Sequence, residues 1–202
     1  MLKGLYIHIP FCSYKCPYCD FVSFADPSAD RKEYLNLLLK EITLYKGLDF
    51  DLRTIYFGGG TPSLIDPGLY QGFMEGLSKL LGLSHVEEIS LEANPENYTL
   101  EDYRYLRSIG FNRISVGAQS LREEGLKTLG RVHSVKDTLK ALDNIHRAGF
   151  ENINMDLIFG YEGQSLEDLQ KELDMLKGLP ITHLSFYLLI LSLASSAHGA
   201  LP

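Results

Sequence analysis

The protein's only three cysteines stand within eight residues near the start of the chain. Cys12, Cys16 and Cys19 follow the spacing C-x₃-C-x₂-C, in which x is any residue. An odd number of thiols on so short a loop makes a poor disulfide set. Three thiolates can instead hold a metal centre. A structural zinc ion or a fully ligated iron–sulfur cluster uses four protein ligands, so three ligands leave one iron of a cubane open to a small molecule.

Two other interpretations of the cysteines stay open. They could be buried apolar residues, although Lys15, Pro17 and Asp20 surround them and disfavour a core position. They could also bind zinc together with His8. This histidine lies in the alternating run Leu5–Ile9, however, and could simply face the interior of the fold.

The residues on both sides of the cysteines carry a family resemblance. The loop is preceded by LYIHIPF, residues 5–11, and its last cysteine is followed by Asp20 and Phe21. This segment resembles the cysteine loop of radical S-adenosylmethionine (SAM) enzymes. More narrowly, it resembles oxygen-independent coproporphyrinogen III oxidases and their haem-chaperone branch. The resemblance implies a [4Fe–4S] cluster on Cys12, Cys16 and Cys19, with SAM bound to the open iron.

Composition limits the classes of function. The chain has 202 residues, 45% of them hydrophobic, and a net charge of −7, so it is large enough for one sizeable folded domain. It has no basic block, which disfavours nucleic acid and anionic membranes as partners. The apolar run Leu184–Ala194 is too short to cross a bilayer, and no signal peptide is evident. Free clustered cysteines are typical of a reducing compartment, so we expect a cytoplasmic protein without a transmembrane segment.

Strand-like and helix-like patterns alternate six times along the chain. The strand-like runs are Leu2–Ile9, Thr54–Phe57, Glu88–Leu91, Arg113–Val116, Ile153–Phe159 and His183–Ile190. The residues expected to cap helices are Asp30, Asp66, Thr99, Ser120, Ser134 and Ser165. Such alternation predicts an α/β protein with parallel strands and helices outside.

An internal echo supports a repeated strand–helix unit. Residues 106–114 and 145–153 both read as a helix end, a Gly-Phe pair and a new strand. Gly110 and Gly149 are expected to end their helices in a left-handed conformation. The phenylalanine after each glycine is expected to pack its helix onto the sheet.

Two architectures fit this alternation, an open doubly wound sheet and a curved partial barrel. We favour an open six-unit (β/α)6 partial TIM-like barrel, because the unusual polar and glycine residues directly follow strands, where barrel active sites are built. The radical SAM core, which the chain resembles over roughly residues 2–191, has this architecture. We therefore expect a core domain over residues 1–191. Residues 192–202 are expected to be an unrelated or disordered tail in place of the family's C-terminal domain, with His198 a weaker candidate haem ligand.

The resemblance also implies a set of SAM contacts. They are Tyr6, Tyr18, Gly59, Gly60, Thr61, Glu92, Gln119, Arg131, Asp156 and Ile190. Four of them, Gly59, Gly60, Arg131 and Asp156, have independent physical support. Glycine lets a ligand approach the backbone closely, arginine offers a fork that suits a carboxylate, and Asp156 is a charge inside an apolar strand that needs a partner or a role. For Tyr6, packing inside the barrel is an equally good interpretation.

The implied chemistry is reductive cleavage of SAM to methionine and a 5′-deoxyadenosyl radical. Phe21 stands where the oxidase branch carries a further cysteine, which favours a haem chaperone. The alternatives are a coproporphyrinogen III oxidase and an inactive truncated fragment. The partners implied by the resemblance are haem or a porphyrinogen, and an electron donor such as a flavodoxin or ferredoxin.

Overall fold

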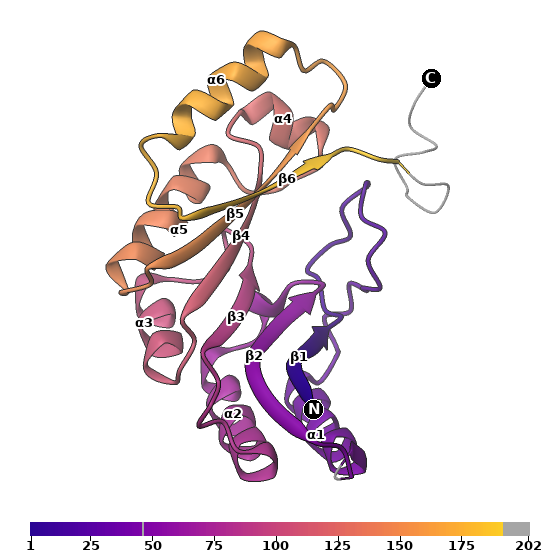
Figure 1. Ribbon diagram of the computed structural model, residues 1–202. Helices are drawn as coiled ribbons and strands as arrows, with labels where there is room; N and C mark the ends of the chain where they lie inside the picture. Colours follow the sequence, from indigo (N-terminus) through magenta and orange to yellow (C-terminus); the bar gives the residue numbers. More distant parts are fainter. Residues whose placement is uncertain (46, 192–202) are drawn as a thin grey trace.

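Parallel β-strands and α-helices alternate throughout the computed structural model, which describes residues 1–45 and 47–191 (Figure 1). The strands are β1 (Leu2–Ile9), β2 (Phe50–Gly59), β3 (Glu88–Ala93), β4 (Arg113–Gln119), β5 (Asn152–Phe159) and β6 (His183–Leu188). The helices are α1 (Arg31–Ile42), α2 (Pro67–Leu81), α3 (Leu100–Ser108), α4 (Glu123–Thr128), α5 (Val135–Arg147) and α6 (Leu166–Leu176). Two short 3₁₀ turns, η1 (Thr43–Tyr45) and η2 (Pro62–Leu64), complete the described elements.

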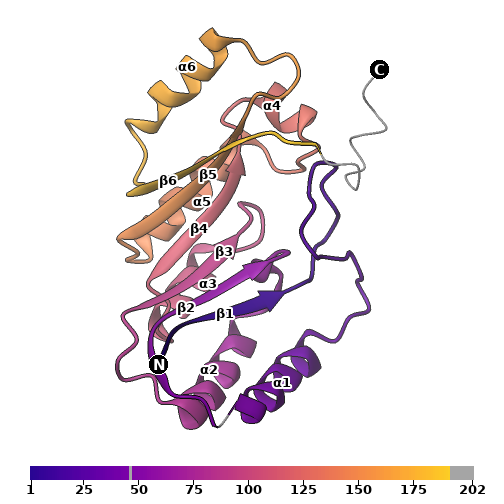
Figure 2. The same cartoon turned by 45° about the vertical axis from the view of Figure 1, so that its right-hand side comes forward.

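The strand order decides between the two expected architectures. All neighbouring strands pair in parallel, and their order in the sheet is the order in the chain, β1 to β6. A doubly wound sheet would reverse direction at a switch point, whereas here every crossover leads to the next strand on the same side. The helices therefore cover one face of a curled sheet, as Figures 1 and 2 show. The predicted open partial barrel is confirmed.

Only β1 has the predicted bounds, and the other five strands differ by one to four residues at one or both ends. β2 begins at Phe50 and runs through Gly58 and Gly59, because these glycines still pair with β1, opposite His8 and Ile9. β6 ends at Leu188, two residues before the predicted end. The bounds of β2 are determined by backbone pairing with β1, which the residue types in this segment do not predict.

The helix caps follow local sequence with one exception. Thr99, Ser134 and Ser165 each form a complete capping box with an aspartate three residues later. The predicted cap at Ser120 is wrong, because α4 begins after Arg122. The hydroxyl of Ser120 is instead engaged with a buried carboxylate from α6.

The core lies between the sheet and its helices. Phe111 and Phe150, the two phenylalanines of the internal echo, are 0% and 1% exposed, so their predicted packing role is confirmed. Gly110 and Gly149 have φ angles of 107° and 90°, the left-handed ends that the echo predicts. Phe111 also lies against the buried ring of Phe57, with ring centroids 5.2 Å apart.

The predicted boundary between residues 191 and 192, and the candidate ligand His198, lie outside the described residues. Among the described helices, none combines the length and the apolar character that a bilayer crossing requires.

Replacing Phe111 with alanine is expected to lower the free energy of unfolding by about 3–5 kcal/mol, because it opens a cavity beneath α3 and β4. Urea denaturation measures this loss. Leu166→Ala is the control, since this leucine is 86% exposed and its loss should change stability by no more than about 0.5 kcal/mol. Equal stability of the two variants would contradict the assigned core.

Candidate functional site

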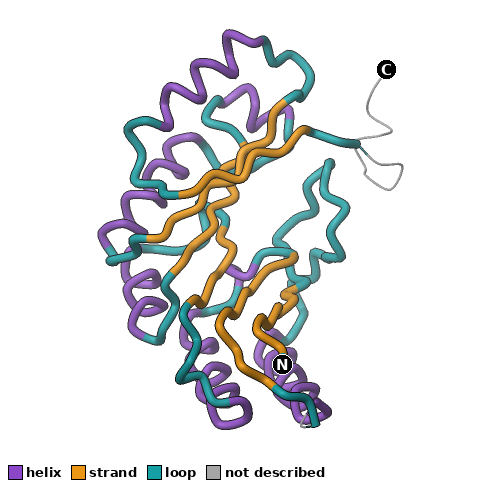
Figure 3. Tube along the Cα trace, viewed as in Figure 1, coloured by secondary structure: helices purple, strands orange, loops and turns teal. Residues whose placement is uncertain are grey.

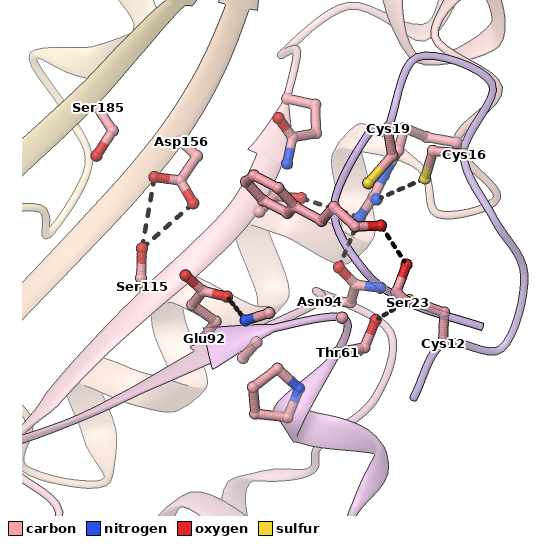
Figure 4. A pocket seen from close by; sticks show the side chains of 18 of the residues that line it. Cys12, Cys16, Cys19, Ser23, Thr61, Glu92, Asn94, Ser115, Asp156 and Ser185 are labelled. Atoms are coloured by element: carbon pink, nitrogen blue, oxygen red, sulfur yellow. Dashed lines mark hydrogen bonds between the residues drawn. The ribbon is translucent and has the colours of Figure 1, made fainter. Parts of the chain in front are cut away.

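One cavity of about 290 Å³ lies at the carboxyl ends of the strands. Figure 3 shows the backbone of the cysteine loop opposite the ends of the strands. The cysteine loop faces the cavity from one side, and the strand ends face it from the other (Figure 4). Most of the predicted site residues line it together, namely Cys12, Cys16, Cys19, Tyr18, Gly59, Gly60, Thr61, Glu92, Gln119, Arg131 and Asp156. The structure therefore brings residues from nearly the whole length of the chain to one place.

Tyr6 and Ile190 lie apart from this lining. The Tyr6 ring is 56% exposed and stacks on Tyr56, with centroids 6.0 Å apart. Ile190 follows β6 and is 73% exposed. Tyr6 is therefore not packed inside the barrel, and its predicted contact with SAM stays a prediction. From β6, Ser185 and Tyr187 line the cavity and Ile190 does not.

The cysteine loop is held at its base by backbone hydrogen bonds. The amide of Cys12 donates to the carbonyl of Phe24 at 3.0 Å. The amide of Phe24 donates in turn to the carbonyl of Pro10 at 2.9 Å. Within the loop, Lys15 Nζ donates to the Phe21 carbonyl at 2.8 Å. These contacts turn the loop back over the sheet and leave the thiols facing the cavity.

All three thiols are free and half-buried. Burial raises the pKa of the Cys19 thiol, an effect that a bound cation would oppose. Two neighbours already donate toward sulfur. Thr61 Oγ1 lies 3.6 Å from Cys12 Sγ, and Arg131 Nη1 lies 3.3 Å from Cys16 Sγ. This is a setting suited to thiolates.

The donor set fits an iron–sulfur cluster better than zinc. The ring of His8 is engaged elsewhere, with Nε2 2.8 Å from the Val22 carbonyl and Nδ1 3.3 Å from the Tyr6 hydroxyl. Within residues 1–45 and 47–191, no group of three or more His, Cys, Asp or Glu side chains could hold a metal ion. In a cubane each cysteine binds a different iron, so its ligands need not converge on one point.

The glycines at the end of β2 hold the cysteine loop against the sheet. The amide of Gly60 donates a hydrogen bond of 2.7 Å to the Ile9 carbonyl, and the amide of Thr61 donates one of 2.7 Å to the Phe11 carbonyl. A Cβ on Gly60 would lie 2.7 Å from the Phe11 carbonyl oxygen, so only glycine permits this approach. These N–H groups are therefore occupied, whereas the sequence had suggested that they are open to a ligand.

Glu92 is the hydrogen-bond acceptor for the Gly59 amide, the remaining N–H of the Gly59–Thr61 segment. Its carboxylate accepts from the Gly59 amide at 3.0 Å and from the Tyr56 hydroxyl at 2.8 Å. Burial is the main cause that raises the pKa of this carboxyl. Tyr56 was not among the predicted site residues, yet it determines where the carboxylate points.

Asp156 lies across the cavity on β5 (Figure 4). It accepts from Asn154 Nδ2 at 2.7 Å and from Ser115 Oγ at 3.2 Å. Burial again dominates and raises the pKa of this carboxyl, although these hydrogen bonds oppose the rise. Asn154 and Ser115 were missed by the sequence prediction, although alternation along β4 and β5 places them on the concave face with Asp156.

Arg131 links the cysteine loop to β3 and β4. Besides Cys16, its guanidinium donates through Nη2 to Asn94 Oδ1 at 2.8 Å and to the Gly117 carbonyl at 3.1 Å. Its Nε is buried and has no hydrogen-bond partner among the described residues. A buried donor without a partner is costly unless a ligand supplies the acceptor.

The buried carboxylates give a pH-dependent prediction. A carboxyl whose pKa is higher in the folded than in the unfolded state contributes stability below its ordinary pKa, and this contribution is lost as pH rises through the raised value. Asp156→Asn removes this loss, so the ligand-free variant should be more stable than wild type at about pH 8. The gap should narrow toward about pH 4, near the ordinary aspartate pKa.

Urea unfolding at the two pH values measures this gap. Glu162→Gln serves as the control, because this carboxylate is exposed and makes no comparable contacts. A stability difference for Asp156→Asn that does not change with pH would contradict the assigned burial.

Comparison with known proteins places this site in a family. The family model described as the radical SAM superfamily matches residues 6–176. The heme chaperone HemW of Bacillus subtilis is 38% identical over 192 residues, which cover 94% of this chain and 51% of the relative. The heme chaperone HemW of Escherichia coli is 39% identical, over 91% of this chain and 50% of the relative.

A solved structure shares the fold. Coproporphyrinogen III oxidase (HemN) of Escherichia coli, a radical SAM enzyme, superposes with a TM-score of 0.84 and 28% identity, over 93% of this chain and 44% of that one. The chain spans about half the length of the curated relatives it matches. Because the family model covers most of the described core, the chain belongs to the radical SAM superfamily.

Proposed function

We propose that this chain is the cofactor-binding half of a haem chaperone, holding a [4Fe–4S] cluster on Cys12, Cys16 and Cys19 and SAM in the adjoining cavity. The observation that carries the proposal is the shared cavity. Three free thiols, an incompletely paired arginine and two buried carboxylates line the same space at the strand ends. Members of the radical SAM superfamily use this cluster together with SAM.

The cluster and SAM, when bound, supply a one-electron reductive cleavage of the sulfonium carbon–sulfur bond. The chain's own residues bind and orient the reactants. The Arg131 guanidinium, which lines the cavity, offers its positive charge to the methionine carboxylate. Asp156 offers acceptor oxygens to the ribose hydroxyls. Glu92, fixed by Tyr56, sets the position of the Gly59–Thr61 segment beneath the cluster.

The haem-chaperone assignment is supported by the relatives and by Phe21. Both relatives described above carry that name, and Phe21 stands where the oxidase branch, which the chain resembles, has a further cysteine. The structural likeness to a coproporphyrinogen III oxidase keeps that reaction as the second candidate. Haem or a porphyrinogen is then the tetrapyrrole partner, a flavodoxin or ferredoxin supplies electrons, and the protein works in the cytoplasm. Residues 1–191 form the core domain in this proposal.

Cys16→Ala should abolish cluster binding, because a cubane with only two protein thiolates has lost one of its three protein ligands. Iron and sulfide content after anaerobic reconstitution measures this loss. Ser13→Ala, on the same loop, is the matched control and should load iron as wild type does. Full iron loading of Cys16→Ala would remove this cysteine from the ligand set.

Asp156→Asn should weaken SAM binding about tenfold, the equivalent of one charge-assisted hydrogen bond, and leave the iron content unchanged. Calorimetric titration of SAM into the reconstituted protein gives the affinity. Unchanged SAM affinity would remove Asp156 from the binding site.

Haem titration separates the two candidate functions. A chaperone should bind haem stoichiometrically, with a stable shift of the Soret band that persists after gel filtration. SAM turnover with a porphyrinogen and no retained haem would favour the oxidase.

A further inference from the structure

A buried carboxylate outside the cavity lies next to Gln119. Glu172 is on α6, only 2% exposed, and it does not line the cavity. Its Oε1 accepts from the Leu121 amide at 2.7 Å and from the Ser120 hydroxyl at 2.5 Å. Its Oε2 accepts from Gln164 Nε2 at 2.9 Å and lies 3.5 Å from the Tyr161 hydroxyl. Every partner donates a hydrogen bond, so the carboxylate is satisfied without a cation.

The segment that Glu172 holds is strained. Gln119 has a φ of 66°, the only positive value outside glycine among the described residues. The amide of Ser120 donates to the carbonyl of Ala118 at 2.8 Å, which closes a three-residue turn around Gln119. Turns of this hand are rare and strained, and they persist only where surrounding structure over-determines them.

Contacts on both sides supply that constraint. Before Gln119, Arg131 Nη2 donates to the Gly117 carbonyl, and His133 Nε2 lies 3.1 Å from the Ala118 carbonyl. After it, Glu172 binds Ser120 and Leu121. The upstream contacts come from the loop that carries Arg131, whereas the downstream contact comes from a helix that otherwise has no part in the site.

The packing around this carboxylate is equally specific. A Cβ on Gly125 would collide with the Ser120 hydroxyl oxygen and with the Tyr161 ring. Glycine within a helix costs stability. At position 125 the missing side chain leaves room for α4 to pack against Ser120 and Tyr161, which both contact Glu172. Gln164 extends these contacts, since its Oε1 accepts from the Gly160 amide at 2.7 Å. The ends of β4 and β5 are thereby tied to one side chain.

We infer that Glu172 is a positioning residue, which holds the turn at Ala118–Ser120 so that Gln119 faces the SAM cavity. This inference rests on the proposed function only for the identity of the ligand. Without the carboxylate, the donors of Ser120 and Leu121 lose their acceptor and the turn can relax to negative φ. Gln119 then leaves the cavity wall while the barrel remains folded.

The first test needs no ligand. In ¹⁵N-labelled protein, Glu172→Ala should shift the amide resonances of Gln119, Ser120 and Leu121 and change the backbone coupling that reports the φ of Gln119. Glu172→Gln keeps the shape of the side chain and one acceptor oxygen, but places an amide group in place of the second oxygen. Its shifts should therefore be smaller than those of Glu172→Ala. Wild-type shifts and coupling in Glu172→Ala would overturn the inference, whatever the outcome for SAM.

The second test measures SAM affinity of the reconstituted protein by calorimetry. Glu172→Ala should bind SAM about tenfold more weakly, the loss expected for one hydrogen bond from Gln119, with Glu172→Gln between it and wild type. Leu142→Ala, a buried α5 variant outside the cavity, controls for lost stability and should keep wild-type affinity. Equal affinity of Glu172→Ala and wild type would contradict the inference, whereas failure of wild type to bind SAM would contradict the proposed function instead.

Discussion

The site depends on the close contact between the ends of β1 and β2. The amides of Gly60 and Thr61 bond to the carbonyls of Ile9 and Phe11, one residue before the first cysteine. Only glycine at position 60 allows the two backbones to approach this closely. This contact fixes where the cysteine loop leaves the sheet. From there the loop lies over the open end of the half-barrel. Arg131 joins Cys16 of this loop to Asn94, directly after β3, and to Gly117 of β4.

The concave face carries two buried carboxylates, and Arg113 and Arg131 line the same cavity. Glu92 and Asp156 are buried enough for burial to raise their pKa values, and the Nε of Arg131 has no partner. Both carboxylates accept hydrogen bonds within the fold, so of these three groups only the Arg131 Nε lacks a partner among the described residues. Under the proposed function, the methionine carboxylate and the ribose hydroxyls of SAM are the ligand groups expected to meet Arg131 and Asp156.

Local features were predictable from the sequence, whereas distant partners were not. The capping boxes at Thr99, Ser134 and Ser165 involve residues three apart, so their pattern is visible in the chain. Ser120 has the same pattern with Glu123 but fails, because Glu172 captures its hydroxyl from 52 residues away. Six alternating units predicted parallel strands with helices outside, and the polar and glycine residues that follow the strands favoured the curled sheet over a doubly wound one. The cysteine spacing with the glycine segment indicated the cavity. The occupied glycine amides and the role of Tyr56 depend on tertiary packing that periodicity does not contain.

The central claim is that three cysteines hold a cubane with one iron open to SAM. Electron paramagnetic resonance of anaerobically reconstituted, dithionite-reduced protein, recorded with and without SAM, tests it most directly. We predict the signal of a reduced [4Fe–4S] cluster whose line shape changes when SAM is added. A signal that SAM leaves unchanged, or a protein that takes up zinc and no cluster, would contradict the account.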